Sequence, residues 1–170
     1  MVALAIIGLT MSVMVTGSRT LLPHTRLRSS ATQLASSLER ARTWAVLEGH
    51  PLEFCYDLEQ RSCSFWLPYA TDDEGRTIGP GRTYRSEPEE LQPGTAIAAV
   101  RLPGGQRRDK GQVILEISPM GRVPPHEVVV VNPEHPDTEL MTVRVNGLSN
   151  RAQVIKGDVT MEAVGDVDFR

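Results

Sequence analysis

The chain is poor in the residues that most catalytic and metal sites use. Its 170 residues include two cysteines and four histidines, too few for a cysteine-rich metal framework. Aromatic residues make up only 5%, so a stacking surface for sugars or bases is poorly supplied. The sequence also lacks a P-loop, a dinucleotide-binding fingerprint and the G-x-S-x-G and H-E-x-x-H motifs. We therefore expect no catalytic residue, no bound metal and no cofactor.

Positive charge is scarce as well. The chain has 18 Lys and Arg against 21 Asp and Glu, a net charge of −3. This charge is uneven, because the first 50 residues sum to +3 and the remaining 120 to −6. A nucleic-acid binder needs clustered basic groups, and in the acidic part only residues 107–110 form such a cluster. The sequence therefore favours partners other than nucleic acid.

Charged residues do not occur in the segment 2–17, VALAIIGLTMSVMVTG. Three interpretations are open: a truncated membrane helix, a degenerate signal peptide or a buried core helix. We favour the membrane helix, because the segment is apolar all round and neither a basic leader nor a clear cleavage site marks a signal peptide. The first arginines follow this run, which by the positive-inside rule conflicts with an exported body. We therefore expect the chain to be incomplete at its N-terminus.

An amphipathic helix is predicted to continue this segment as far as Gly49, with Pro51 beyond it as a breaker. Its apolar stripe has alternating spacings of four and three residues: Leu27, Ala31, Leu34, Leu38, Ala41 and Ala45. Pro23 lies between the apolar run and this stripe, so the sequence predicts either one long kinked helix or two helices that meet there. We expect Leu27, Leu34 and Leu38 to dock the helix on a sheet.

From residue 52 onward the pattern is that of strands and turns. Segments 52–58 and 62–69 predict a hairpin, and five more short strands are expected at 95–102, 112–118, 127–132, 140–146 and 152–159. The acidic, glycine- and proline-rich stretch 71–94 is predicted to be a solvated loop. Trp44 and Trp66 are expected between helix and sheet. The predicted fold class is α+β, a long N-terminal helix packed on an antiparallel β-sheet head.

The two cysteines lie eight residues apart on the predicted hairpin. A hairpin loop with an odd number of residues would place Cys55 opposite Cys63. We expect a disulfide between them, because an exported domain meets an oxidising compartment. Two reduced, half-buried cysteines are the alternative.

The order of these segments resembles the type IV pilin-like superfamily, and within it the GspH/FimT group of minor pseudopilins and minor pilins. The stretches that carry the resemblance are VALAIIGL (2–9), LASSLERARTWAVLEGHPLEF (34–54), LQPGTAIAAV (91–100), VILEISPMGRV (113–123) and VRVNGLSNRAQV (143–154). The basic leader of that family, and the acidic residue near the start of its mature helix, have no counterpart here.

The resemblance implies a structural subunit of a type II secretion pseudopilus or a type IV pilus, and no enzyme. It implies a membrane and filament-core segment at 1–18, an amphipathic continuation at 19–49 and a periplasmic head at 50–170. The chain would cross the bacterial inner membrane once, carry methylation, and bind other pseudopilins or pilins and secreted proteins. Anchoring and assembly would fall to Val2, Leu4, Ile6, Ile7, Leu9, Val13 and Val15. A DNA-binding minor pilin and a membrane-tethered periplasmic enzyme remain as alternatives.

Overall fold

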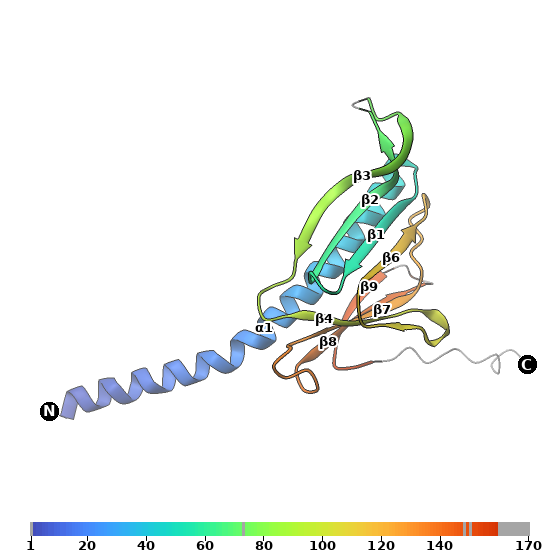
Figure 1. Cartoon of the computed structure of the whole chain (residues 1–170). Coiled ribbons are helices and arrows are strands. Elements are labelled where there is room, and N and C mark those ends of the chain that lie inside the picture. Colours follow the sequence, from blue (N-terminus) through green and yellow to red (C-terminus); the bar gives the residue numbers. More distant parts are fainter. Residues whose placement is uncertain (1, 73, 148, 150, 160–170) are drawn as a thin grey trace, which may run out of the picture.

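A computed structural model describes residues 2–72, 74–147, 149 and 151–159, with side chains from residue 24 onward. Over these residues one long helix, α1 (Val2–Glu48), is followed by strands in two antiparallel sheets and a single 3-10 turn at Pro103–Gly105. Figure 1 shows the strands gathered around the C-terminal half of α1, while its N-terminal half projects away from them. The predicted α+β class is confirmed.

Helix α1 is continuous through Pro23, so the prediction of a single long helix holds over that of two helices. Its 47 residues span about 70 Å at 1.5 Å per residue. The helix ends where Gly49 takes a positive φ of 67° and donates its N–H to the carbonyl of Ala45 at 3.0 Å. Among the described residues, no helix combines the length and hydropathy that a membrane span requires.

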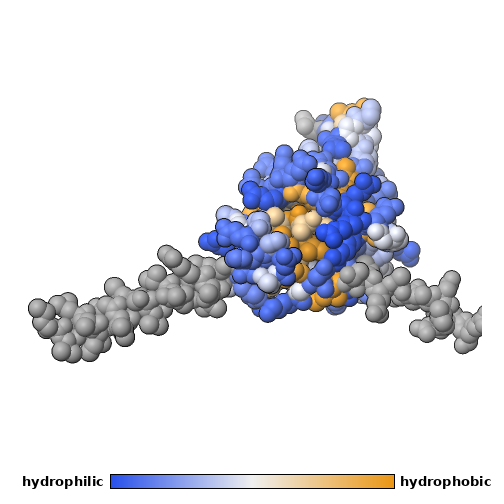
Figure 2. Space-filling model, turned by 60° about the horizontal axis from the view of Figure 1, so that its bottom comes forward, coloured by the Kyte–Doolittle hydropathy of each residue, from blue (hydrophilic) through white to orange (hydrophobic). Residues whose placement is uncertain are grey.

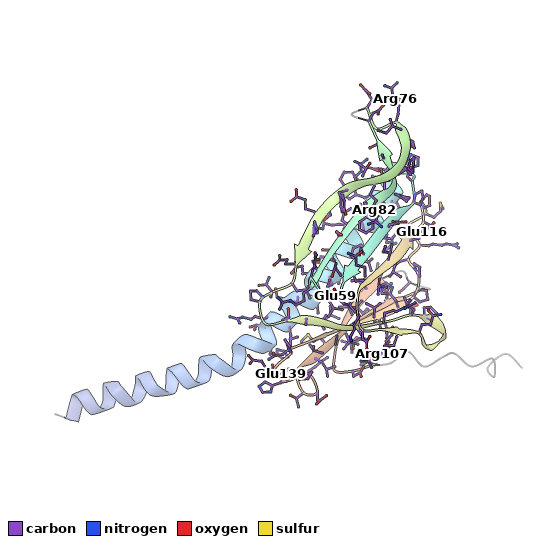
Figure 3. The ribbon with its side chains drawn as sticks, in the orientation of Figure 1. Glu59, Arg76, Arg82, Arg107, Glu116 and Glu139 are labelled. Atoms are coloured by element: carbon purple, nitrogen blue, oxygen red, sulfur yellow. The ribbon has the colours of Figure 1, made fainter. Side chains whose placement is uncertain are left out.

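The first sheet has the strand order β3-β2-β1-β6. These strands are β1 (Leu52–Asp57), β2 (Ser62–Thr71), β3 (Thr77–Glu90) and β6 (Gln112–Ile117). The β1–β2 pair and β6 correspond to predicted strands. Figure 3 shows Arg76 at the tip of the β2–β3 hairpin, where its guanidinium pairs with Asp72 (3.1 Å) and Glu74 (2.9 Å).

The second sheet has the order β5-β4-β7-β8-β9. It is built from β4 (Ala96–Arg101), β5 (Arg107–Arg108), β7 (His126–Val131), β8 (Leu140–Asn146) and β9 (Arg151–Lys156). Four of its strands fall where the sequence predicts them, and the two-residue β5 falls in a predicted turn. Strand β7 is buried along its whole length, as its run of four valines indicates.

Both sheets share one hydrophobic core with α1. The helix contributes the stripe that its spacing predicts, and the strands contribute every second residue, such as Phe54, Leu115 and Val128. Leu27, Leu34 and Leu38 are all buried in this core. The head is therefore assembled around the C-terminal half of α1.

The prediction of a solvated loop at 71–94 is wrong, because residues 77–90 form the 14-residue strand β3. This strand lies at the edge of its sheet and is largely exposed, so it has no apolar alternation for sequence reasoning to detect. Its pairing with β2 also shifts register at several points, which breaks any regular pattern.

The prediction of a Cys55–Cys63 disulfide is wrong as well, since both cysteines are free. Asp57 pairs with Ser62, so the β1–β2 loop holds the four residues 58–61 rather than an odd number. This register sets Cys55 opposite Ser64 and Cys63 opposite Tyr56. Because side chains alternate across a strand, the two thiols lie on opposite faces of the sheet.

The two tryptophans do not pack between helix and sheet as expected. Trp44 is 41% exposed on α1. Trp66 is buried, but it lies on the face of the first sheet that points away from the core, where Arg82 stacks on its ring at 4.4 Å. Its Nε1 donates to Glu53 at 2.6 Å, so a polar shell rather than the helix covers the indole.

Candidate interaction surfaces

The residues predicted to anchor and assemble the subunit lie in the projecting part of α1. Their backbone is helical, and their side chains fall outside the part of the chain described in detail. They are Val2, Leu4, Ile6, Ile7, Leu9, Val13 and Val15. They therefore lie on the same helix that enters the head.

Polar contacts join α1 to the edge strand β3. Ser37 Oγ donates to Glu89 at 2.8 Å, and Arg40 forms an ion pair with the same carboxylate. Burial opposes ionisation of Glu89, yet the hydrogen bonds from Arg40 and Ser37 outweigh it and lower its pKa. Arg85 on β3 pairs with Glu48 at the end of the helix at 3.0 Å. These contacts fix β3 along α1 without apolar burial.

A buried hydrogen bond joins the two sheets. Tyr56 on β1 and His126 on β7 are both buried, and the Tyr56 Oη lies 2.9 Å from His126 Nε2. His126 Nδ1 lies 2.7 Å from the carbonyl oxygen of Pro124, which can only accept, so Nδ1 carries the proton and Nε2 accepts from Tyr56. Burial lowers the pKa of His126 to about 4. This histidine is therefore a neutral structural link.

Ion pairs cross the other face of the second sheet. Glu127 on β7 is only 1% exposed and accepts from Arg144 on β8 at 2.9 Å. Arg101 on β4 lies 3.6 Å from Glu127 and pairs with Asp158 at 2.5 Å. The hydrogen bond from Arg101 lowers the pKa of Asp158. The chain after β9 is thereby held across the sheet.

A groove of about 600 Å³ lies between the outward face of α1 and β9. It is lined by Thr32, Ala35, Ser36, Glu39, Arg40, Thr43, Trp44 and Leu47 of α1 and by Ala152 and Val154 of β9. Leu47 is 77% exposed, so apolar surface is open to solvent. An exposed apolar groove of this kind is a common feature of surfaces that bind other molecules. Apolar residues also gather at the centre of the mostly hydrophilic side of the molecule that Figure 2 draws.

Sequence reasoning missed most of these surfaces. His126 carried a signal, since a polar residue on the inward face of a valine-rich strand needs a buried partner. Glu89 carried none, because its partners on α1 are some 50 residues away in sequence. The groove depends on where β9 lies against the helix, which no local pattern specifies.

Chemistry-bearing groups do not converge in the described part of the chain. No three His, Cys, Asp or Glu side chains there are placed to hold a metal ion. Arg107 and its neighbours lie at the exposed edge strand β5, well away from Arg76 in Figure 3. The strongest features of these residues are the polar contacts of β3 with α1 and the partly apolar groove beside β9.

Comparisons with known proteins point to the same class. A search of curated proteins finds no significant match. Two solved structures of the minor pseudopilin EpsH from the type II secretion system of Vibrio cholerae are similar in fold, each with a TM-score of 0.57. They are 14% and 16% identical to this chain, of which they cover 79% and 80%, and each is covered over 99% of its own length.

A family model described as type II transport protein GspH matches residues 30–149. The match begins within α1 and continues to the turn after β8, so it includes most of the buried half of the helix and every strand of the two sheets except β9. This span is more than half of the chain and agrees with the resemblance that the sequence motifs indicate. The chain belongs to the GspH family of type II transport proteins.

Proposed function

We propose that this chain is a minor pseudopilin, a subunit of the type II secretion pseudopilus that acts by membrane anchoring and assembly. The observation that carries the proposal is the construction of α1. One unbroken helix joins an uncharged apolar run at 2–17 to a stripe buried in the head. A force or a contact at one end of such a helix is transmitted to the other end.

The C-terminal half of α1 fixes the head. Leu27, Leu34 and Leu38 are each at most 2% exposed. Burying a leucine side chain contributes about 1.5–3 kcal/mol, so these three side chains hold helix and sheets together as one body. In the proposal, this half of the helix and residues 50–170 form the periplasmic head.

The N-terminal half of α1 serves as anchor and polymerisation helix. In the proposal, the uncharged run at 2–17 lies in the inner membrane before assembly, and in the filament it exchanges contacts with lipid for contacts with neighbouring helices. The residues that make these contacts are Val2, Leu4, Ile6, Ile7, Leu9, Val13 and Val15. The partners are the other pseudopilins, and the head faces the periplasm and the secreted proteins.

No specific observation in the described part of the chain favours the two alternatives, a DNA-binding minor pilin and a membrane-tethered periplasmic enzyme. The basic residues 107–110 lie at one edge of the second sheet and do not form a continuous track across the described surface. The described residues also form no convergent polar site of the kind that an enzyme needs. We therefore propose neither DNA uptake nor catalysis.

The test replaces Ile7 with Asp in the full chain, expressed in a bacterium whose type II secretion depends on it. A charge at the centre of the apolar run costs several kcal/mol in a membrane or a helix bundle. The variant should lose membrane association and crosslinks to the other pseudopilins, and secretion should stop. The head should remain folded, as shown by its resistance to proteolysis.

Two control variants make this test specific. Ile7→Leu keeps an apolar side chain and should assemble normally. Ile114→Asp makes the same chemical change at an exposed position of β6 and should leave membrane association unchanged. Normal assembly and secretion with Ile7→Asp would contradict the proposed function.

A further inference from the structure

Strand β9 has a free edge that faces the groove beside α1. Among the strands of the described residues, it is bonded to β8 alone. Gly157, just after the strand, donates its N–H to Leu140 of β8 (3.1 Å), whereas Ala152 donates to the Glu39 side chain of α1 (3.5 Å). Hydrogen-bonding groups alternate along an antiparallel strand, so the peptide groups of Val154 and Lys156 also point away from β8. This edge can accept a further strand.

The groove offers apolar contact next to that edge. Val154 and Ala152 form one wall, and Trp44 and Leu47 are open to solvent on the other. A segment paired with β9 would direct alternate side chains to one side, where they would cover this apolar surface. Backbone pairing would provide affinity and the groove would select the side chains.

The two charged residues that line the groove are ion-paired, and the exposed charges beside it that have no ion pair within the described residues are positive. Its acid, Glu39, is neutralised by Arg42 at 3.2 Å, and the groove residue Arg40 is paired with Glu89 on β3. Three exposed cations surround the site without an ion pair in the described part of the chain: Arg28, Arg151 and Lys156. Arg28 lies in the polar continuation of the groove along α1, and the other two bound β9. A complementary segment therefore carries acidic side chains.

We propose that an extended acidic segment of a neighbouring subunit pairs with the free edge of β9 and lies in the groove beside α1. The proposal rests on the proposed function, because it names the kind of segment by which the head would bind a neighbour. It commits to strand addition at Val154 and Lys156, with carboxylates near Lys156, Arg151 and Arg28.

The test measures binding of two fluorescent probe peptides to the full chain in detergent micelles by anisotropy. Both probes alternate valine with serine, and two adjacent aspartates at each end of one probe are replaced by lysines in the other, so that charged side chains point to both faces of the added strand. The aspartate peptide should bind about tenfold more tightly than the lysine peptide, although the protein itself has a net charge of −3. Equal binding of the two peptides would overturn the proposal.

Two pairs of variants locate the binding. Val154→Pro removes an N–H that points away from β8, so the edge strand should persist while peptide affinity falls about tenfold; Val154→Thr keeps the N–H and the affinity. Lys156→Glu should also weaken the aspartate peptide about tenfold, whereas Lys110→Glu, at a distant exposed turn, should not. Circular dichroism confirms the fold of each variant. If Val154→Pro unfolds, the comparison of Lys156→Glu with Lys110→Glu tests the proposal.

Other occupants of the groove would be revealed by the same measurements. Binding that occurs only after removal of residues 160–170 would overturn the proposal and assign the groove to the chain itself. If the chain associates with itself and Val154→Pro abolishes that association, the groove binds a second copy of this chain, and the proposal would be overturned as well. Peptide binding requires neither a membrane nor a filament. The outcome of the peptide measurements therefore does not depend on the outcome of the Ile7→Asp test, and a failure of either proposal can be recognised separately.

Discussion

Strands β3 and β7 lie in the same molecule but are held in place in opposite ways. All six residues of β7 are buried, and it is paired on both sides, with β4 and β8. Strand β3 is mostly exposed, is paired with β2 alone among the described strands, and is fixed to α1 by Glu89 and Arg85. Burial of apolar side chains builds the centre of the head, while polar contacts of modest strength attach its edge.

The largest expected effect comes from placing a charge in each strand. Val128→Asp puts an unpaired carboxylate in the core and should lower the free energy of unfolding by at least about 4 kcal/mol. An aspartate at the exposed start of β3, introduced by Thr77→Asp, should change the free energy of unfolding by no more than about 0.5 kcal/mol. Urea denaturation of the full chain in detergent measures both. A similar decrease in the free energy of unfolding for both variants would mean that β3 contributes as much to the stability of the fold as β7.

A second effect comes from His126 at the start of β7. Its pKa is lowered to about 4 by burial, while in the unfolded chain it is near 6.5. As the pH falls, His126 is therefore protonated in the unfolded chain before it is protonated in the folded chain. The free energy of unfolding is highest above pH 6.5 and decreases by about 3 kcal/mol in total as the pH falls toward 4. Unfolding free energies measured across this range would show the slope.

The control for this slope is His126→Gln, which keeps polar groups at the site but cannot titrate. It should be less stable near neutral pH and nearly flat between pH 6.5 and about 5. Glu89 and Asp158 have pKa values below their ordinary 4.5 and 3.8, so their contributions begin to be lost only near those values, and the slope due to His126 is measured above about pH 5. An unchanged slope in His126→Gln would refute the assignment to this histidine.

The smallest effect is expected at the edge. Glu89→Gln removes the charge that Arg40 and Ser37 bind and should cost about 0.5–1 kcal/mol, because the ion pair is partly exposed to solvent. Hydrogen exchange in β3 should accelerate while that in β7 stays unchanged. Glu87→Gln, at a neighbouring exposed position, should leave both unchanged.

The same contrast explains how far the sequence alone could reach. The stripe of α1 and the strand β7 were predictable because their apolar periodicity reflects the face that they bury. Strand β3 was not, since its pairing is encoded in backbone groups and in contacts with a helix some 50 residues earlier. The candidate groove depends on the packing of β9 against α1, which is a tertiary property. The protein family could nonetheless be predicted from the sequence, because several short motifs occur along the chain in the order that is typical of that family.

The four-residue turn between β1 and β2 has a consequence for how the head can mature. By turning Cys55 and Cys63 to opposite sides, it leaves the molecule with no covalent crosslink to form. Burial raises the pKa of each thiol to about 11, so neither is a ready nucleophile. The head can therefore fold without an oxidase and keep its shape in a reductant, because noncovalent contacts hold it together.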